Sequence, residues 1–167
     1  VDLPFEVRVS DVPEEADRPG RPPAEIALEH ARDKALAVAA ALPERLVLGA
    51  DTVVVLDDQV LGKPADAAEA AAMLRRLQGR THEVWTGLAV VRGGEQRTAA
   101  EVSHVQFVRL GEAEIAAYVA TGEPLDKAGA YGIQGTAAQF VRRVEGDYFN
   151  VVGLPLARLR QLLREFE

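Results

Sequence analysis

The stretch VLGADTVVVLDDQVLGKP, residues 47–64, indicates two adjoining strands, because apolar β-branched runs lie on either side of the acidic pair Asp57-Asp58. One aspartate, Asp51, stands inside the first run. A carboxylate buried in a strand costs roughly several kcal/mol unless it is paired, hydrogen-bonded or bound to a metal. We therefore expect Asp51 either at an opening in the sheet or beside a cationic partner.

The sequence before this stretch predicts a strand, a loop and a helix. Residues 5–9 alternate apolar and polar side chains, which is typical of a half-buried strand. Residues 11–23 are rich in proline and acidic side chains and are expected to form a loop. The pair Pro22-Pro23 then introduces an alanine-rich helix that reaches about Leu42.

The sequence after this stretch continues the alternation of helices and strands. Asp66 is a good N-cap for an amphipathic helix that ends at Gly79, and Gly93-Gly94 is the turn between two long strands. The remaining predicted segments are a helix at 112–120, a long ordered loop with a short strand at 139–144, and a closing helix at 156–166. This order predicts an α/β fold with a mixed sheet.

Composition limits the classes of protein to which the chain can belong. Its 167 residues are 48% hydrophobic and 27% charged, which suits one globular domain with a substantial core. No apolar run has the length of a membrane span, and no cysteine is present to form a disulfide or a thiolate metal site. The net charge of −7 argues against non-specific binding to nucleic acid, because its field repels phosphate. We expect a cytoplasmic protein that binds neither membrane nor nucleic acid.

The residues available for chemistry favour a phosphate site. The sequence has no G-x-x-x-x-G-K-[ST] loop, no G-x-G-x-x-G after a strand, and no histidines at metal-ligand spacing. Sixteen arginines accompany only three lysines, Lys34, Lys63 and Lys127, and a lysine ammonium suits a phosphate in a crowded pocket. Carboxylates such as Asp51 and Glu14, together with lysines, suit a hard cation such as Mg²⁺ or Mn²⁺ and an anionic phosphate. That combination predicts phosphoryl chemistry.

Three long segments resemble the successive signatures of the Maf family of nucleoside triphosphate pyrophosphatases. They are LGADTVVVLDDQVLGKP, LQGRTHEVWTGLAVV and DKAGAYGIQGTAAQFVRRVEGDYFNVVGLPL, in the family's order and spacing. The resemblance covers the chain from about Phe5 to Leu163 and implies a single Maf-like domain over residues 1–167. It implies an elongated α/β fold, similar to that of the inosine triphosphate pyrophosphatases, with helices flanking the sheet and a cleft between two lobes. It also implies a homodimer.

The resemblance assigns roles to the acidic residues and the lysines. It implies that Asp51 is the proton acceptor that activates water beside a divalent cation, Mg²⁺ or Mn²⁺, with Glu14 as a second candidate metal ligand. The water would attack the α-phosphorus of a nucleoside triphosphate and release a nucleoside monophosphate and pyrophosphate. Lys34, Lys63 and Lys127 fall in the family's signatures as phosphate or cleft residues.

The resemblance also bears on the choice of base. The ADT and GIQG motifs look like those of the dTTP/UTP pyrophosphatases, which favours Thr52 and Gln134 as the residues that read the base. From the residues alone, Gln134 could equally satisfy the carbonyls of a turn, although its amide offers a donor and an acceptor to a pyrimidine imide. A second hypothesis stays open, that of a nucleotide- or protein-binding regulator of cell division with little turnover.

One difference from the family concerns the start of the sequence. Family members begin with a strand and a Ser-x-Ser-Pro-Arg-Arg loop that grips the triphosphate, and this sequence begins at Val1, just beyond that point. We therefore expect the domain to lack this segment, and to be less active than a chain that carries it.

Overall fold

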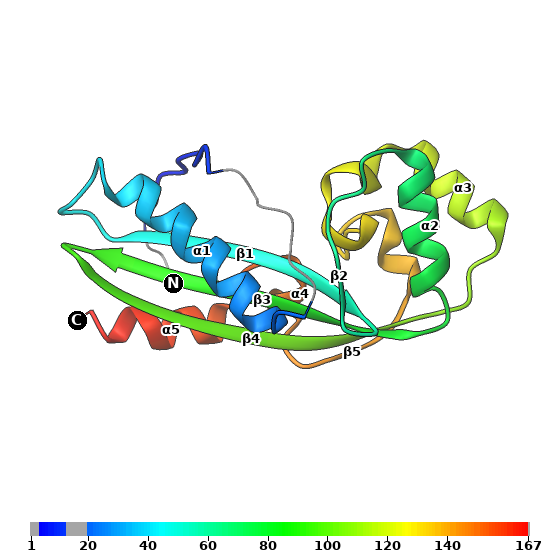
Figure 1. Ribbon diagram of the computed structural model, residues 1–167. Coiled ribbons are helices and arrows are strands. Elements are labelled where there is room, and N and C mark those ends of the chain that lie inside the picture. Colours follow the sequence, from blue (N-terminus) through cyan, green and yellow to red (C-terminus); the bar gives the residue numbers. More distant parts are fainter. Residues whose placement is uncertain (1–3, 13–19, 167) are drawn as a thin grey trace.

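The chain folds around one long five-stranded sheet, and the computed structural model describes residues 4–12 and 20–166. The helices and strands are α1 (Pro23–Ala39), β1 (Val47–Leu56), β2 (Gln59–Leu61), α2 (Ala67–Leu77), β3 (Thr81–Arg92), β4 (Glu95–Phe107), α3 (Glu112–Ala120), β5 (Val141–Glu145), α4 (Tyr148–Val152) and α5 (Leu156–Arg164). Between α3 and β5 lie three short 3₁₀ helices, η1 (Glu123–Asp126), η2 (Ala128–Ala130) and η3 (Thr136–Phe140). Figure 1 shows α2, α3 and this 3₁₀ segment gathered at one end of the elongated sheet.

The strand order is β2-β1-β3-β4-β5, and every pairing in the described chain is antiparallel. The α/β class is as expected, but the expectation of a mixed sheet was wrong. The chain leaves β1 and returns into β3 at the same end of the sheet, where Val55 faces Glu83. A strand that starts where its neighbour ended must run antiparallel to it, whereas a parallel pair needs a crossover to the opposite end.

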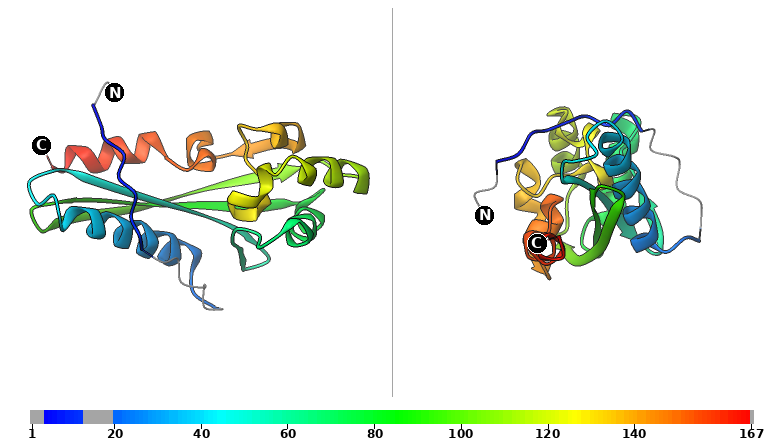
Figure 2. Two further views of the ribbon diagram at one scale, coloured as in Figure 1. Left: turned by 90° about the horizontal axis from the view of Figure 1, so that it is seen from above. Right: turned by 90° about the vertical axis from the view of Figure 1, so that its left-hand side faces the viewer.

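Helices cover both faces of the sheet. In Figure 2 the sheet lies between α1 on one face and α5 on the other. The β1 side chains that face α1 alternate with those that face the opposite side, so Val53 packs against Ile26 and Ala27 while Val54 packs into the core beside α2. Only residues Val54–Leu56 of β1 pair with β2, so residues 47–53 form an edge of the sheet in the described chain.

Helix α1 approaches the sheet unusually closely. A Cβ at Gly87 would lie 2.3 Å from the carbonyl carbon of Ala27, and a Cβ at Gly49 would lie 2.2 Å from the carbonyl oxygen of Ala31. The helix presents only small side chains at this contact, because Ala27, Ala31 and Ala35 are completely or almost completely buried. The two bare glycines therefore fix the height of α1 above β1 and β3, and with it the position of every side chain on that helix.

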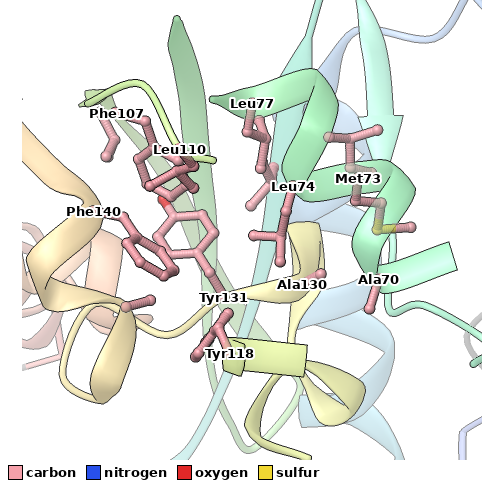
Figure 3. Packing of buried hydrophobic residues seen from close by; sticks show 14 of the residues in the cluster. Ala70, Met73, Leu74, Leu77, Phe107, Leu110, Tyr118, Ala130, Tyr131 and Phe140 are labelled. Carbon is pink, nitrogen blue, oxygen red and sulfur yellow. The ribbon is translucent and has the colours of Figure 1, made fainter. Parts of the chain in front are cut away.

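The elements gathered at one end of the sheet, α2, α3 and the 3₁₀ segment, form what we call the second lobe, and this lobe has the larger core. Figure 3 shows α2 side chains packed against the aromatic rings of Phe107, Tyr118, Tyr131 and Phe140. These rings meet edge to face, with centroids 4.8 Å apart for Phe107 and Tyr131. The Asp66 side chain accepts from Glu69 N at 2.8 Å, so the predicted N-cap of α2 is present. This core holds the 3₁₀ segment against the end of β1.

Two predicted segments differ from the structure. Residues 5–9 do not form a strand, and Phe5 and Val9 are each 87% exposed. Alternation marks which face of a strand would be buried, but a strand also needs a neighbour for its backbone hydrogen bonds, and that partner cannot be read from five residues. The helix α4 forms inside the segment expected to be loop, where Asp147 accepts from Phe149 N at 2.8 Å and Gly153 ends the helix with a positive φ of 115°.

Among residues 4–12 and 20–166, no helix combines the length and the apolar composition that a bilayer crossing requires.

Candidate active site

A cavity of about 740 Å³ lies where α1 and the edge of β1 meet the second lobe. Its walls come from α1, β1, the link after β2, residues 127–135 and the end of α4. All six site residues that the sequence predicted within the described chain line it: Lys34, Asp51, Thr52, Lys63, Lys127 and Gln134. Segments far apart in the sequence therefore bring three lysines and one carboxylate to a single opening.

Asp51 lies at the edge of the sheet and also has a cationic partner, so both explanations for its position hold. Lys34 Nζ donates to Asp51 Oδ1 at 2.6 Å, and His30 Nδ1 lies 3.2 Å from Asp51 Oδ2. The Asp51 side chain is only 10% exposed, so these contacts compensate for much of its lost hydration. Both carboxylate oxygens are held from α1, and the orientation of the carboxylate is fixed.

The helix geometry explains this arrangement. His30 and Lys34 are four residues apart on α1 and therefore lie one above the other on the same side. They flank the contact face of the helix, and Asp51 faces Gly87 on the neighbouring strand β3, one of the two glycines that α1 approaches closely. Sequence reasoning missed His30 because it tested histidines only for metal-ligand spacing. The i, i+4 spacing from Lys34 was the signal available.

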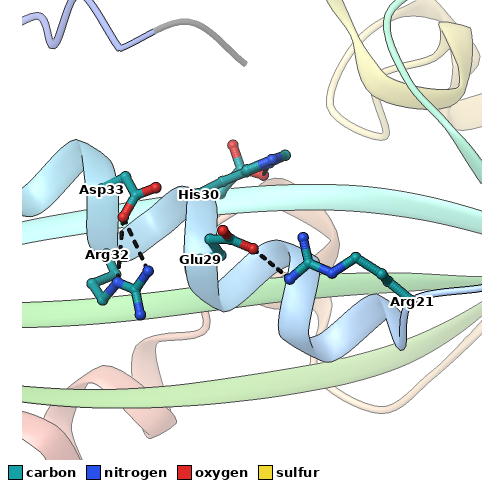
Figure 4. A network of polar contacts seen from close by, with 6 residues as sticks. Arg21, Glu29, His30, Arg32 and Asp33 are labelled. Carbon is teal, nitrogen blue, oxygen red and sulfur yellow. Dashed lines mark hydrogen bonds and ion pairs between the residues drawn. The ribbon is translucent and has the colours of Figure 1, made fainter. Parts of the chain in front are cut away.

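The outer side of α1 carries different polar contacts. Arg21 pairs with Glu29, and Arg32 lies 3.3 Å from Asp33. Figure 4 shows His30 directed away from the Arg21–Glu29 pair. Partly exposed pairs of this kind contribute at most about 1 kcal/mol each. They keep the solvent side of α1 polar, while His30 and Lys34 line the cavity.

Two further lysines enter the cavity from the second lobe. Lys63 follows β2, and its neighbour Gly62 accepts a hydrogen bond from Gly129 N at 3.1 Å, which ties the two loops together. Lys127 Nζ donates to Asp126 Oδ1 at 2.7 Å. A Cβ at Gly132 would lie 2.6 Å from Lys127 Cε, so the lysine stem lies directly over a bare glycine. The position of Lys127 and the path of the following loop are therefore coupled.

The Thr52 hydroxyl donates its hydrogen within the protein. The Thr86 hydroxyl donates to the carbonyl oxygen of Asn150 at 3.0 Å, and the Thr52 and Thr86 hydroxyl oxygens are 2.9 Å apart. Since Thr86 uses its hydrogen on Asn150, Thr52 must donate to Thr86. The Thr52 oxygen therefore offers the cavity an acceptor rather than a donor.

Comparison with known proteins identifies the family of this chain. The profile described as "Maf-like protein" matches residues 1–166. The chain belongs to the Maf family. The dTTP/UTP pyrophosphatase of Symbiobacterium thermophilum is 54% identical over 166 residues, which cover 99% of this chain and 85% of that protein. The dTTP/UTP pyrophosphatases of Bacillus cytotoxicus, at 52% identity (99% and 86% covered), and Salinibacter ruber, at 54% (98% and 81% covered), are similar over comparable lengths.

The cavity of this Maf protein offers a divalent cation one carboxylate ligand. Asp51 is the only carboxylate among the cavity's described lining residues. The described part of the chain contains no group of three or more His, Asp or Glu side chains arranged to hold a metal ion. Mg²⁺ commonly takes one or two carboxylates and completes its shell with phosphate oxygens and water. Glu14, the second predicted ligand, lies outside the described residues.

A second histidine, His82, lies behind the cavity wall of the Maf protein and contacts a residue that forms this wall. Its Nε2 lies 2.7 Å from the hydroxyl of Tyr131, which lines the cavity. Its Nδ1 is buried and has no hydrogen-bond partner within residues 4–12 and 20–166. Burial lowers the pKa of His82 to about 4, because a protonated ring would place an unpaired charge in the core. His82 is therefore neutral at physiological pH.

The pKa of His82 predicts how stability depends on pH. The unfolded chain binds a proton near pH 6.5 and the folded chain does so only near pH 4, so the free energy of unfolding falls as the pH drops through this window. The slope should be about 1.4 kcal/mol per pH unit, or ~3 kcal/mol in all. Urea unfolding of the parent at pH 7, 6 and 5 measures it. His82→Gln should flatten the slope, whereas the exposed His104→Gln should not; equal slopes in all three proteins would contradict the assignment.

Proposed function

We propose that this Maf protein is a nucleoside triphosphate pyrophosphatase that hydrolyses dTTP or UTP to the nucleoside monophosphate and pyrophosphate. The observation that carries the proposal is the carboxylate of Asp51, held by Lys34 and His30 at the edge of a cavity that two more lysines enter. The names of the similar proteins support the same reaction and the same substrates. An enzyme accounts for a fixed carboxylate in a cavity, which a regulator with little turnover would not require.

In the proposed reaction, Asp51 accepts a proton from a water molecule. The water oxygen forms a bond to the α-phosphorus, the bond from that phosphorus to the bridging oxygen breaks, and the electron pair leaves with pyrophosphate. Lys34 and His30 keep the carboxylate in place during the transfer, so little reorientation is needed when charge moves. Lys63 and Lys127 are suited to compensate the negative charge that builds up on the leaving pyrophosphate.

We also propose a requirement for Mg²⁺ or Mn²⁺. When bound, such an ion supplies Lewis-acid polarisation of the phosphate oxygens and lowers the pKa of the attacking water. Asp51 would hold it, with Glu14 as the second proposed ligand. The cytoplasmic location and the homodimer stay predictions.

For base selection we propose Thr52 and Gln134. The acceptor that Thr52 presents suits the imide N–H of thymine or uracil, and the Gln134 amide N–H suits a neighbouring ring carbonyl. Gln134 lies on the loop between Gly132 and Gly135 and lines the same cavity as Thr52 of β1. Two polar groups from two lobes would then read one edge of the pyrimidine.

The experiment that tests the function is a nucleotide panel with product analysis. The protein is incubated with dTTP, UTP, CTP, dATP and GTP, with Mg²⁺, with Mn²⁺ and with a chelator. We expect dTTP and UTP to be the best substrates, with monophosphate and pyrophosphate as the first products and no turnover with the chelator. Orthophosphate as the first product would place the attack at another phosphorus and overturn the mechanism.

Gln134→Leu tests base reading. Lysines and metal should still bind the triphosphate, but the pyrimidine loses one of its two hydrogen-bond partners, and an unpaired polar group costs about 1–3 kcal/mol. The ratio of kcat/KM for dTTP to that for GTP should fall about tenfold. Gln139→Leu, the same change at an amide that bonds Thr136 O outside the cavity, should leave the ratio unchanged. If both rates drop together in Gln134→Leu, the residue supports the loop and does not read the base.

A further inference from the structure

A glutamate outside the cavity lining holds the loop that carries Gln134. Glu123, at the start of η1, accepts from Tyr118 OH at 3.0 Å through Oε1 and from Thr136 N at 3.1 Å through Oε2. Tyr118 OH in turn lies 3.4 Å from Gly132 N. The backbone of residues 132–136 is therefore anchored at both ends by one carboxylate and the phenol beside it.

The same loop is shaped to close around Glu123. A Cβ at Gly135 would lie 2.0 Å from Glu123 Oε1, so the glycine lets the backbone pass against the carboxylate. At Gly132 a Cβ would meet the stem of Lys127 at 2.6 Å. The two glycines on either side of the Ile133-Gln134 pair are thus in contact with Glu123 and Lys127, and neither has room for a side chain.

Glu123 is charged in this setting. Partial burial acts to raise its pKa, but the hydrogen bonds from Thr136 N and Tyr118 OH and the nearby charge of Lys127 outweigh burial and hold the pKa below its ordinary value. A carboxylate accepts from both donors at once, whereas a neutral amide at the same place can accept through only one of its two end atoms. Tyr118 is 2% exposed and packs edge to face on Phe140, so its hydroxyl is a fixed point.

We propose that Glu123, supported by Tyr118, is a positioning residue for nucleobase selectivity: it holds the loop of residues 132–136 so that Gln134 faces the base. The inference rests on the proposed function. Because the contacts of Glu123 run to the backbone of the loop, its loss displaces the base reader while Asp51, Lys34 and Lys63 stay in place. A displacement of Lys127 would alter phosphate binding equally for all nucleoside triphosphates. It would therefore leave the ratio of kcat/KM between two nucleotides unchanged.

Glu123→Gln and Tyr118→Phe test the proposal. In Glu123→Gln the ratio of kcat/KM for the preferred pyrimidine triphosphate to that for GTP should fall about tenfold, equivalent to ~1.4 kcal/mol. Tyr118→Phe keeps the ring in the core and removes only the hydroxyl, so a smaller fall, of about threefold, is expected. In both variants kcat for the preferred nucleotide should fall less than the ratio does.

Glu114→Gln is the matched control. Its carboxylate also accepts from a backbone amide in the second lobe, Gly111 N at 2.8 Å, but at the start of α3 and away from the cavity. It should lower stability without changing the selectivity ratio. Hydrogen exchange provides a readout without substrate: the amides of residues 132–136 should exchange faster in Glu123→Gln and Tyr118→Phe, and not in Glu114→Gln.

The outcomes separate this inference from the proposed function. If the parent hydrolyses pyrimidine triphosphates but both variants keep its selectivity ratio and its exchange rates, Glu123 does not position the loop and the inference is overturned. The same holds if Glu114→Gln changes the ratio as much as Glu123→Gln, because the effect is then one of stability. If the parent hydrolyses no nucleotide, the proposed function fails. Unchanged hydrogen exchange at residues 132–136 in the variants would still show that Glu123 does not hold this loop.

Discussion

Asp51→Asn is expected to lower kcat by about a hundredfold or more, because the amide keeps the size of the side chain but cannot accept the proton of the attacking water. The amide oxygen can still accept from Lys34 Nζ, but the negative charge that pairs with the ammonium is lost. Nucleotide binding should survive better than turnover, since Lys63 and Lys127 are untouched. Steady-state kinetics on dTTP, with nucleotide affinity measured by calorimetry, distinguishes the two effects.

Asp33→Asn serves as the control for this change. Asp33 lies on the outer side of α1, 3.3 Å from Arg32, and does not line the cavity. The same loss of one negative charge there should leave kcat within about twofold, because an exposed pair contributes little. An Asp51→Asn protein with the parental rate would assign the general base elsewhere, with Glu14 and Asp11 as the next residues to test.

Gly87→Ala is expected to reduce the free energy of unfolding by about 3 kcal/mol, because the added methyl group meets backbone that cannot rotate away. Its Cβ would lie 2.3 Å from the carbonyl carbon and oxygen of Ala27, so α1 must move off the sheet. Since α1 also carries His30 and Lys34, activity of the folded fraction should fall as well. Urea unfolding at pH 7 measures the first effect and kinetics below the unfolding transition measure the second.

Gly62→Ala is the matched control for stability. A Cβ at Gly62 would meet nothing within 4 Å, and its φ is not in the left-handed region. The substitution should leave the free energy of unfolding unchanged or raise it slightly, because alanine restricts the unfolded chain. Equal stability of Gly87→Ala and the parent would mean that α1 adjusts freely above the sheet, and that the glycines do not set its height.

The sequence by itself determined the elements whose signals are local. The turn at Asp57-Asp58 adopts positive φ values of 52° and 59°, as expected for a tight hairpin turn, and Asp66 caps α2 through a bond three residues away. The Gly93-Gly94 hairpin between β3 and β4 formed for the same reason. Such features depend on side chains within a few residues of one another, so their spacing alone predicts them. The family was likewise identified from contiguous signatures.

Tertiary structure alone decided how distant residues combine. The sequence indicated that Asp51 needed an opening or a cation, but only the packing of α1 onto Gly49 and Gly87 brings Lys34 and His30 to it. The antiparallel direction of β3 followed from where the chain returned to the sheet, not from any pattern within the strand. The role proposed for Glu123 depends on loop residues up to 13 positions away. Contacts of this kind are fixed by the packing of the whole chain, because local spacing does not specify which surfaces meet.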